Sequence, residues 1–382
     1  MEKIDYKKEA LKIHEEYKGK LEIKSVVPIN DKETLSTLYT PGVAEPCLKI
    51  AENKEDIYKY TMKTRLCAVI TDGSAVLGLG NIGAKASIPV MEGKCALFKE
   101  FGGIDSIPIA IETQEVDKFV ETVIQIHSTF GAINLEDISA PRCFEIEKKL
   151  DEALDIPVFH DDQHGTAVVV LAGLINALKI TEKQKEEIKI VVNGVGAAGT
   201  AIIKLLHKYG VKQIIAVDST GIIHTDREKN MNTIKNEIAE ITGQIKGGTL
   251  LDSLKDADVF VGVSKPNILG EKEIAEMKDN PIIFALSNPN PEIDYDLAKK
   301  LGVKILATGR SDYPNQINNV LAFPGIIKGA LQNRVKKITD EMKINAAKVI
   351  ANMVESPTEE EIIPNPFRRE IAEEVSKVII ER

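Results

Sequence analysis

The sequence predicts an α/β protein made of two α/β halves followed by a C-terminal helical segment. From Leu66 onward, short apolar runs alternate with longer stretches of helical periodicity, as they do in βαβ units. A second series of the same kind follows a long apolar helix, and 382 residues are enough for two or more domains. We therefore expect domains at residues 1–163, 164–330 and 331–382. No flexible linker separates the first two, so the halves are expected to pack across a cleft.

Apolar runs of strand length and 3.6-residue periodicity give the individual elements. The expected strands are Leu66–Thr71, Ile107–Glu112, Ala132–Ile138 and Pro157–His160, then Lys189–Asn193, Gln213–Val217, Val259–Val263, Ile282–Leu286 and Lys304–Ala307. The expected helices between them include Val116–Thr129, Thr166–Ile180 and Ala197–Lys208. An amphipathic helix containing Tyr6 and Tyr17 opens the chain. After Gly329 the pattern is helical, with a last helix capped by Asn365 and carrying Pro366 at its first position.

The composition excludes several function classes. The net charge is −9, which disfavours nucleic acid and membrane surfaces as partners, because both attract basic side chains. The longest apolar stretch, residues 166–178, is interrupted by Asn176 and is too short to span a bilayer. The four cysteines are scattered and the charged N-terminus lacks an apolar signal core. We expect an enzyme of the cytoplasm.

One glycine-rich turn has the full context of a dinucleotide site. Gly194, Gly196 and Gly199 follow a strand and open an unbroken helix, and the next strand ends on Asp218. Such glycines let backbone N–H groups approach a pyrophosphate at a helix N-terminus. Asp218 would accept hydrogen bonds from the adenosine ribose, which favours NAD and repels a 2′-phosphate. The alternative is that the glycines only allow close packing of helix on strand.

A second copy of the same spacing lacks that context. Gly78, Gly80 and Gly83 precede a helix that Pro89 is expected to interrupt, and no acidic residue ends a following strand at the right distance. These glycines are interpreted as shaping a loop around a small substrate, or simply as a turn.

Two acidic pairs fall at the carboxyl ends of expected strands, where open α/β sheets bind ligands. They are Glu136-Asp137 and Asp161-Asp162. Carboxylates around one cleft suit Mg²⁺ or Mn²⁺, although solvated loop carboxylates give the same pattern. His160 and His164 are spaced like a zinc pair but span a strand-to-helix junction, so zinc is not expected. His164 is instead expected to help start a helix from Gly165.

Four further polar residues stand out from their surroundings. Lys94 lies in an apolar segment, where desolvation or a metal ion would lower its pKa toward that of a general base; a surface lysine is the alternative. Tyr39 precedes a turn and is either functional or a buried structural tyrosine. Asn288 and Asn319 follow elements of the second half, and each either caps a turn or binds a carboxylate or carboxamide.

Eight segments in order resemble malic enzyme, specifically its short bacterial and archaeal form. They are Tyr39-Thr-Pro-Gly-Val43, the segment Thr71 to Gly80, Pro89-Val-Met-Glu-Gly-Lys94, Glu136-Asp137, the segment Phe159 to Thr166, the segment Gly194 to Gly199, Ala285-Leu-Ser-Asn-Pro289, and the segment Asn318 to Gly325. The resemblance covers residues 39 to about 330. It implies a substrate and metal domain, a Rossmann-type domain and C-terminal helices.

The resemblance also implies an activity and a role for each site residue. The activity is oxidative decarboxylation of (S)-malate to pyruvate and CO₂ with NAD or NADP, and decarboxylation of oxaloacetate. Lys94 would be the base for the C2 hydroxyl, and Tyr39 would donate a proton to C3 of enolpyruvate. The metal ligands would be Glu136, Asp137 and Asp162. Cofactor contacts would come from Gly194, Val195, Gly196, Ala197, Ala198, Gly199, Asp218 and Asn288, and substrate contacts from Asn288 and Asn319. The resemblance further implies a homodimer.

One departure leaves the substrate-carboxylate clamp unassigned. Larger members carry an arginine in this loop, whereas this sequence has Ala75 there, as is usual in short forms. Arg65 and Arg310 are the remaining candidates for the clamp.

Two rival interpretations stay open at this point. A metal-independent Rossmann dehydrogenase, such as an amino-acid dehydrogenase, would leave the three carboxylates unexplained. A non-catalytic nucleotide-sensing module would bind NAD without turnover.

Overall fold

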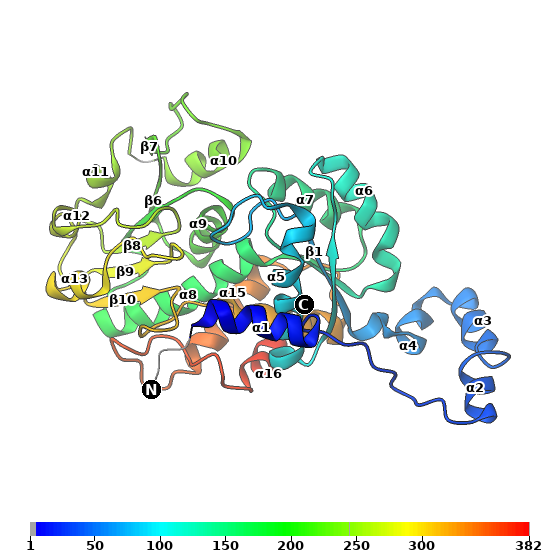
Figure 1. Cartoon of the computed structure of the whole chain (residues 1–382). Helices are drawn as coiled ribbons and strands as arrows, with labels where there is room; N and C mark the ends of the chain where they lie inside the picture. Colours follow the sequence, from blue (N-terminus) through cyan, green and yellow to red (C-terminus); the bar gives the residue numbers. More distant parts are fainter. Residues whose placement is uncertain (1–4, 244, 382) are drawn as a thin grey trace.

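Two sheets with helices on both faces make up the computed structural model, which describes residues 5–243 and 245–381 (Figure 1). The first sheet has the order β2-β1-β3-β4 and the second β10-β9-β8-β5-β6-β7. All strand pairs are parallel except β6 with β7. The strands are β1 Leu66–Thr71, β2 Asp105–Ala110, β3 Ala132–Leu135, β4 Val158–His160, β5 Lys189–Asn193, β6 Gln213–Asp218, β7 Gly221–Ile222, β8 Val259–Gly262, β9 Ile282–Ala285 and β10 Ile305–Thr308. The α/β class and the Rossmann-type second half are confirmed.

The central strands are apolar because helices cover both of their faces. β1 is buried at all of its positions, and so are β3, β8 and β9. All nine expected strands are present; two have the expected bounds, and the ends of the others differ by one to three residues. Pairing of β5 with both β6 and β8 places the reversal of strand order beside the glycine-rich turn that follows β5.

The helices before the second sheet depart from expectation in α5 and at the start of α8. They are α1 Tyr6–Tyr17, α2 Lys32–Leu38, α3 Ala44–Glu52, α4 Ile57–Tyr60, α5 Gly83–Leu97, α6 Val116–Ile126, α7 Arg142–Ala153 and α8 Asp161–Thr181. The expected break at Pro89 is wrong, since α5 continues through it. Proline removes one backbone donor, and the burial of Met91 and Cys95 in the core holds the remaining turns.

α8 packs in a core that belongs to both halves. Its buried residues share one apolar cluster with Val69 of β1, Phe159 of β4 and Val192 of β5. The helix starts at Asp161, with His160 as its N-cap, so the start near Gly165 that we expected is wrong. The expected domain boundary at residue 163 therefore lies inside this helix. By length and composition α8 is also apolar enough to cross a membrane, but 67% of that window is buried inside the protein.

The remaining helices cover the second sheet and return to the first half. They are α9 Ala197–Tyr209, α10 Thr233–Thr242, α11 Leu250–Leu254, α12 Glu271–Ala275, α13 Tyr295–Lys300, α14 Phe323–Asn333, α15 Asp340–Asn352 and α16 Ile371–Ser376. The C-terminal part is less helical than expected, because residues 353–370 form turns. Asn365 accepts a hydrogen bond from the Phe367 N–H (2.9 Å), which makes a local turn rather than a helix start.

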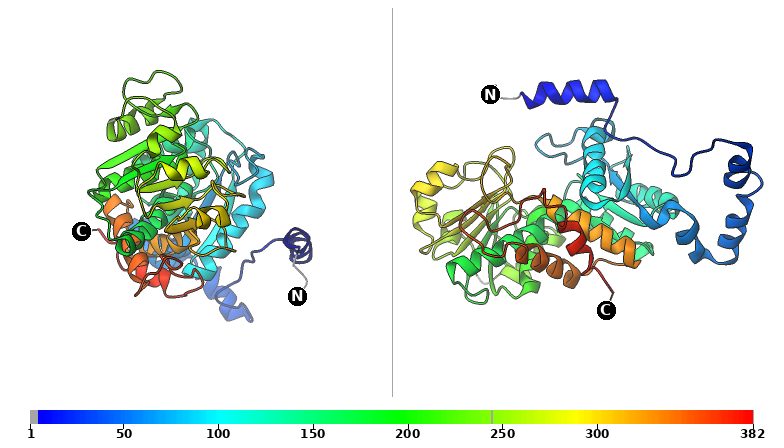
Figure 2. Two further views of the ribbon diagram at one scale, coloured as in Figure 1. Left: turned by 90° about the vertical axis from the view of Figure 1, so that its left-hand side faces the viewer. Right: turned by 90° about the horizontal axis from the view of Figure 1, so that it is seen from below.

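An N-terminal arm, residues 5–62 with α1 to α4, stands apart from the two-sheet body (Figure 2). None of the four helices has a buried residue. The opening helix that we expected is present, yet its tyrosines Tyr6 and Tyr17 are 77% and 70% exposed. The arm thus presents apolar side chains that this chain does not itself cover.

Candidate active site

A cavity of about 1100 Å³ lies between the carboxyl ends of the two sheets. The first half contributes Lys94 from α5 and the residues that follow β3, and the second half contributes the turn after β5 and the ends of β8 to β10. His14 and Lys20 line it from α1 and the segment after α1. Since parallel strands place their carboxyl ends at one edge, both sheets direct their loops into the same space.

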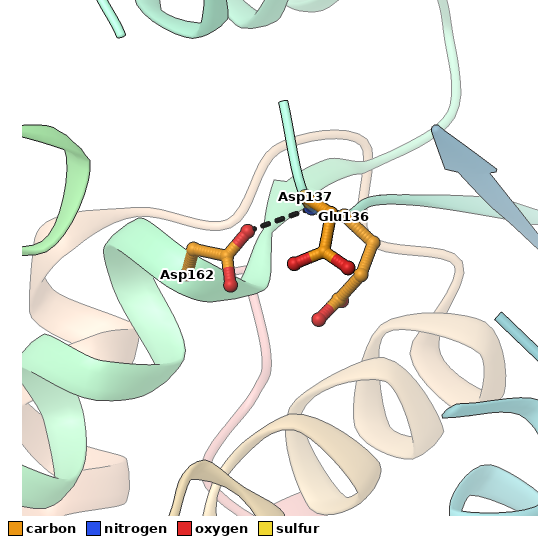
Figure 3. Close-up of side chains that lie close together, drawn as sticks. All are labelled: Glu136, Asp137 and Asp162. Atoms are coloured by element: carbon orange, nitrogen blue, oxygen red, sulfur yellow. Dashed lines mark hydrogen bonds between the residues drawn. The ribbon is translucent and has the colours of Figure 1, made fainter. Parts of the chain in front are cut away.

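Three carboxylates meet on one wall of this cavity (Figure 3). Glu136 and Asp137 follow β3, and Asp162 comes from the first turn of α8; one oxygen of each lies within 4.8 Å of the others. Asp162 Oδ2 accepts a hydrogen bond from the Asp137 N–H (2.8 Å), and Asp137 takes a left-handed backbone conformation, φ 54°. The wall therefore joins two strand ends through one hydrogen bond.

Lys94 lies against this cluster and is only 8% exposed. Its Nζ is 2.5 Å from Asp161 Oδ2 and 2.9 Å from Glu136 Oε1. Burial alone would lower the pKa of Lys94, but Asp161 and Glu136 outweigh it and raise the pKa above its ordinary value. The alternative of a surface lysine is wrong. Burial therefore does not lower the Lys94 pKa as expected, because the two carboxylates raise it, and lowering by a metal ion stays a prediction.

The carboxylates carry more negative charge than Lys94 compensates. Burial raises the pKa of Glu136 to about 7 and that of Asp162 to about 6, and burial with the charge of Asp162 raises that of Asp137 to about 8. Asp137 Oδ2 is buried and has no hydrogen-bond partner. Buried oxygens with free lone pairs, within reach of one another, fit a hard divalent ion such as Mg²⁺ or Mn²⁺.

The sequence indicates Asp161 only as part of the Asp161-Asp162 pair, but in the structure Asp161 has contacts of its own in the site. Its side chain is fully buried, and Oδ2 accepts from Lys94 Nζ and from Asn319 Nδ2. A Cβ on Gly165, one turn further along α8, would lie 1.8 Å from Asp161 Oδ1. Only glycine at position 165 leaves room for this side chain. The signal in the sequence was the adjacent Asp161-Asp162 pair followed by Gly165.

The glycine-rich turn after β5 lies opposite the carboxylates. Gly196, Ala197 and Ala198 line the cavity where α9 begins. A Cβ on Gly194 would lie 2.7 Å from the Val263 carbonyl oxygen, and one on Gly199 would lie 1.7 Å from the Gly194 carbonyl oxygen. These contacts require glycine for packing, and a helix start of this kind leaves backbone N–H groups without partners. Packing therefore accounts for Gly194 and Gly199, and the dinucleotide interpretation stays a prediction.

Asp218 ends β6 as expected, but its carboxylate is already paired. Oδ2 lies 2.5 Å from Arg227 Nη2 and 2.7 Å from Lys235 Nζ, and Oδ1 accepts from the Thr220 N–H at 2.8 Å. Burial would raise the pKa of Asp218, but the hydrogen bonds from Arg227 and Lys235 outweigh it and lower the pKa. With two cations beside one anion, this corner does not repel a 2′-phosphate as a lone aspartate would.

The two asparagines lie at the cavity, whereas the two candidate arginines do not. Asn288 and Asn319 both line it, from the loop after β9 and the turn before α14. Arg65 pairs with Asp105 (2.7 Å), and Arg310 pairs with Asp312 through two hydrogen bonds of 2.8 and 2.6 Å. Among the described residues that line the cavity, the cations are instead Lys94 and Lys20.

Tyr39 lies outside this cavity. It follows α2 on the N-terminal arm, its residue is 67% exposed, and it is not among the described residues that line the cavity. The alternative of a buried structural tyrosine is therefore wrong. Within one chain, Tyr39 and Lys94 are not brought together.

Comparisons with known proteins match both halves of the chain. Residues 163–381 match the family domain "Malic enzyme, NAD binding domain", and residues 18–115 and 112–151 match "Malic enzyme, N-terminal domain". The bifunctional malic/malolactic enzyme of Bacillus subtilis is 53% identical over 98% of this chain and 92% of its own length. An NAD-dependent malic enzyme of Geobacillus stearothermophilus is 53% identical over 95% of this chain and 76% of its own. The crystal structure of an NAD-dependent malic enzyme from Thermotoga maritima has a TM-score of 0.94 at 50% identity, covering 97% of this chain and 98% of that one.

Glu136→Gln tests the carboxylate cluster as a cation site. The amide keeps the size of the side chain but removes one negative ligand, so Mn²⁺ affinity, measured by electron paramagnetic resonance of the free ion, is expected to fall at least about tenfold. Glu112→Gln is the matched control, since Glu112 is exposed near the end of β2 and pairs with Lys85 (3.0 Å). Equal Mn²⁺ affinity in the two variants would contradict the assignment.

Proposed function

This chain belongs to the malic enzyme family, and we propose that it oxidatively decarboxylates (S)-malate to pyruvate and CO₂. NAD or NADP accepts the hydride, and Mg²⁺ or Mn²⁺ binds at Glu136, Asp137 and Asp162. Decarboxylation of oxaloacetate follows from the same chemistry. The observation that carries the proposal is that Lys94, the three carboxylates and the glycine-rich turn line one cavity. A metal-independent dehydrogenase would have no use for that cluster, and a nucleotide sensor would have no use for Lys94.

Lys94 is the proposed base for the C2 hydroxyl. Its Nζ faces Asp161 and Glu136, so a proton taken from substrate can be shared with the Asp161 carboxylate, whose pKa burial raises to about 7. Asn319 donates to the same Asp161 oxygen and holds that side chain in place. When bound, the divalent ion supplies a Lewis acid for the substrate oxygens and offsets the carboxylate charge that keeps Lys94 protonated. Asn288 and Asn319 are proposed to orient substrate and nicotinamide.

Tyr39 is the proposed acid for C3 of enolpyruvate, and we propose that it acts in the site of a second copy. A proton donor must reach its acceptor atom within hydrogen-bond distance, and Tyr39 does not line the cavity of its own chain. Its arm exposes apolar side chains from Tyr6 to Met62. Leu77 and Val90, which line the cavity, are also exposed, so an apolar rim beside the site matches the apolar arm. A homodimer with exchanged arms covers both surfaces and completes two sites.

The cofactor corner supports use of both NAD and NADP. Asp218 can accept a ribose hydroxyl, and Lys235 carries a charge that a 2′-phosphate would pair with. Arg227 also donates to the backbone carbonyls of Gly221 and Lys229, so it holds the loop that carries the cations.

We propose the following division of the chain and location. Residues 1–163 supply substrate and metal groups, residues 164–330 bind the dinucleotide, and residues 331–382 complete the core. The four cysteines are all free thiols, which supports a reducing, cytoplasmic location. The net charge of −9 supports a small-molecule substrate rather than nucleic acid or a membrane surface.

An assay of NADH or NADPH formation from malate with Mn²⁺ tests the proposed function. Activity is expected to disappear with EDTA and to return with Mn²⁺. Lys94→Ala is expected to reduce turnover at least about 100-fold, because it removes the base, while NADH binding measured by fluorescence stays within about twofold. Activity that persists in EDTA would favour a metal-independent dehydrogenase, and NADH binding without any turnover would favour a sensor.

Subunit complementation tests whether Tyr39 acts across the dimer. Tyr39→Phe and Lys94→Ala subunits, each nearly inactive alone, are unfolded together and refolded as an equal mixture. Shared sites give hybrid dimers with one intact site, so activity is expected to return to about a quarter of the wild-type value, since half of random dimers are hybrids. If both residues act within one chain, mixing restores nothing.

Lys235→Ala tests cofactor choice. Loss of one charge-assisted contact is expected to weaken NADPH binding about tenfold and to change NADH binding much less, as measured by fluorescence titration. Lys246→Ala is the control, because this exposed lysine pairs with Asp226 and not with Asp218. Equal loss of NADH and NADPH affinity would mean that Lys235 only stabilises the loop.

A further inference from the structure

A chain of polar side chains that the proposed reaction does not use lies behind the first turn of α8. Glu147 from α7, His164 from α8 and Lys343 from α15 are partly or fully buried, with side chains 16%, 20% and 10% exposed. They line a second cavity of about 500 Å³, which shares no lining residue with the first. Glu147, His164 and Lys343 therefore connect the first half, the second half and the C-terminal segment of the protein.

The hydrogen bonds of His164 indicate which of its ring nitrogens accepts and which donates. Lys343 Nζ lies 3.3 Å from His164 Nδ1, and an ammonium group can only donate, so Nδ1 accepts. Nε2 then carries the hydrogen and donates to Glu147 Oε1 at 2.7 Å. Asp340 holds Lys343 from the other side, at 2.7 Å. Burial would raise the pKa of Glu147, but the interaction with His164 outweighs it and lowers the pKa to about 2, so Glu147 is a carboxylate.

Glu147 accepts hydrogen bonds from His160 and Gln163, the residues that flank Asp161 and Asp162. Its Oε1 accepts from the His160 N–H (3.2 Å), and its Oε2 accepts from Gln163 Nε2 (3.0 Å). α8 has no side-chain cap of its own, although a helix start leaves four N–H groups without partners. The Glu147 carboxylate of α7 therefore caps the start of α8 in place of a side chain of α8 itself. Its negative charge also interacts favourably with the positive end of the helix dipole.

We propose that Glu147, with His164 and Lys343, is a positioning unit that holds the first turn of α8 so that Asp162 keeps its place among the metal ligands. The inference rests on the proposed metal site. Asp162 Oδ2 accepts a hydrogen bond from the Asp137 N–H, and the backbone of the first turn of α8 sets the point from which this carboxylate extends. Residues that orient metal ligands affect affinity strongly without touching the ion.

Mn²⁺ affinity of the full-length protein, measured by paramagnetic resonance without malate or cofactor, tests the proposal. Glu147→Gln keeps the shape but loses one acceptor, and His164→Leu removes the donor; each is expected to weaken Mn²⁺ binding about tenfold. His164→Gln retains an amide N–H toward Glu147 and is expected to stay within about threefold of the wild type. NADH binding, which uses the turn after β5, is expected to stay unchanged.

Asp258→Asn is the matched control for a general loss of stability. Asp258 is also a buried carboxylate that accepts from two lysines, Lys183 and Lys278, and from the Lys189 N–H. It directly precedes β8 and so lies at the amino end of that strand, whereas the cavity lies at the carboxyl ends. Its variant is expected to lower the thermal midpoint while keeping Mn²⁺ affinity. Glu147→Gln and His164→Leu proteins that melt earlier but bind Mn²⁺ like the wild type would overturn the positioning role. A wild-type protein that binds no Mn²⁺ would instead overturn the metal site, and the positioning role with it.

Discussion

The crowding of buried carboxylates around one lysine is the constraint on which the rest of the structure depends. Glu136, Asp137, Asp161 and Asp162 place four potential negative charges around Lys94. Two like charges about 4 Å apart repel by about 4 kcal/mol in a partly buried setting, so one ammonium does not compensate for this set. Such a cluster needs a rigid scaffold, and its repulsion is relieved either by protonation of carboxylates whose pKa burial raises or by the cation proposed above.

That scaffold is built from strand ends and one helix start, rather than from the segments between them. β3 delivers Glu136 and Asp137, β4 and α8 deliver Asp161 and Asp162, and the cores on both sides of the sheets keep these backbones in place. Of the two carboxylates that Lys94 contacts, Glu136 also belongs to the three-carboxylate cluster, whereas Asp161 does not. A change at Glu136 is therefore expected to act on the proposed base and on the proposed cation site together.

The sequence could predict what depends on local pattern. Buried parallel strands are apolar runs, so the nine expected strands could be found in the sequence. The turn after β5 could be recognised from its glycines, which begin at Gly194, and from Asp218 at the end of the next strand. It could not predict what depends on contacts between distant residues. The tertiary packing of Met91 and Cys95 keeps α5 helical through Pro89, the pairing of Lys94 with Asp161 reverses the expected pKa shift, and Arg227 and Lys235 neutralise Asp218. The exposure of Tyr39 likewise depends on the path of the whole arm.

The shared core around α8 has a consequence for how this protein can be divided. The family domain that matches the second half begins at residue 163, in the first turn of a helix whose buried side chains share one apolar core with β1 and β4 as well as β5. A gene fragment cut at that residue would encode either a sheet that lacks its covering helix or a helix that lacks half of its neighbours. The two recognisable sequence units are therefore inherited as one folding unit, and recombination between relatives would preserve the fold only if its crossover points lay outside α8.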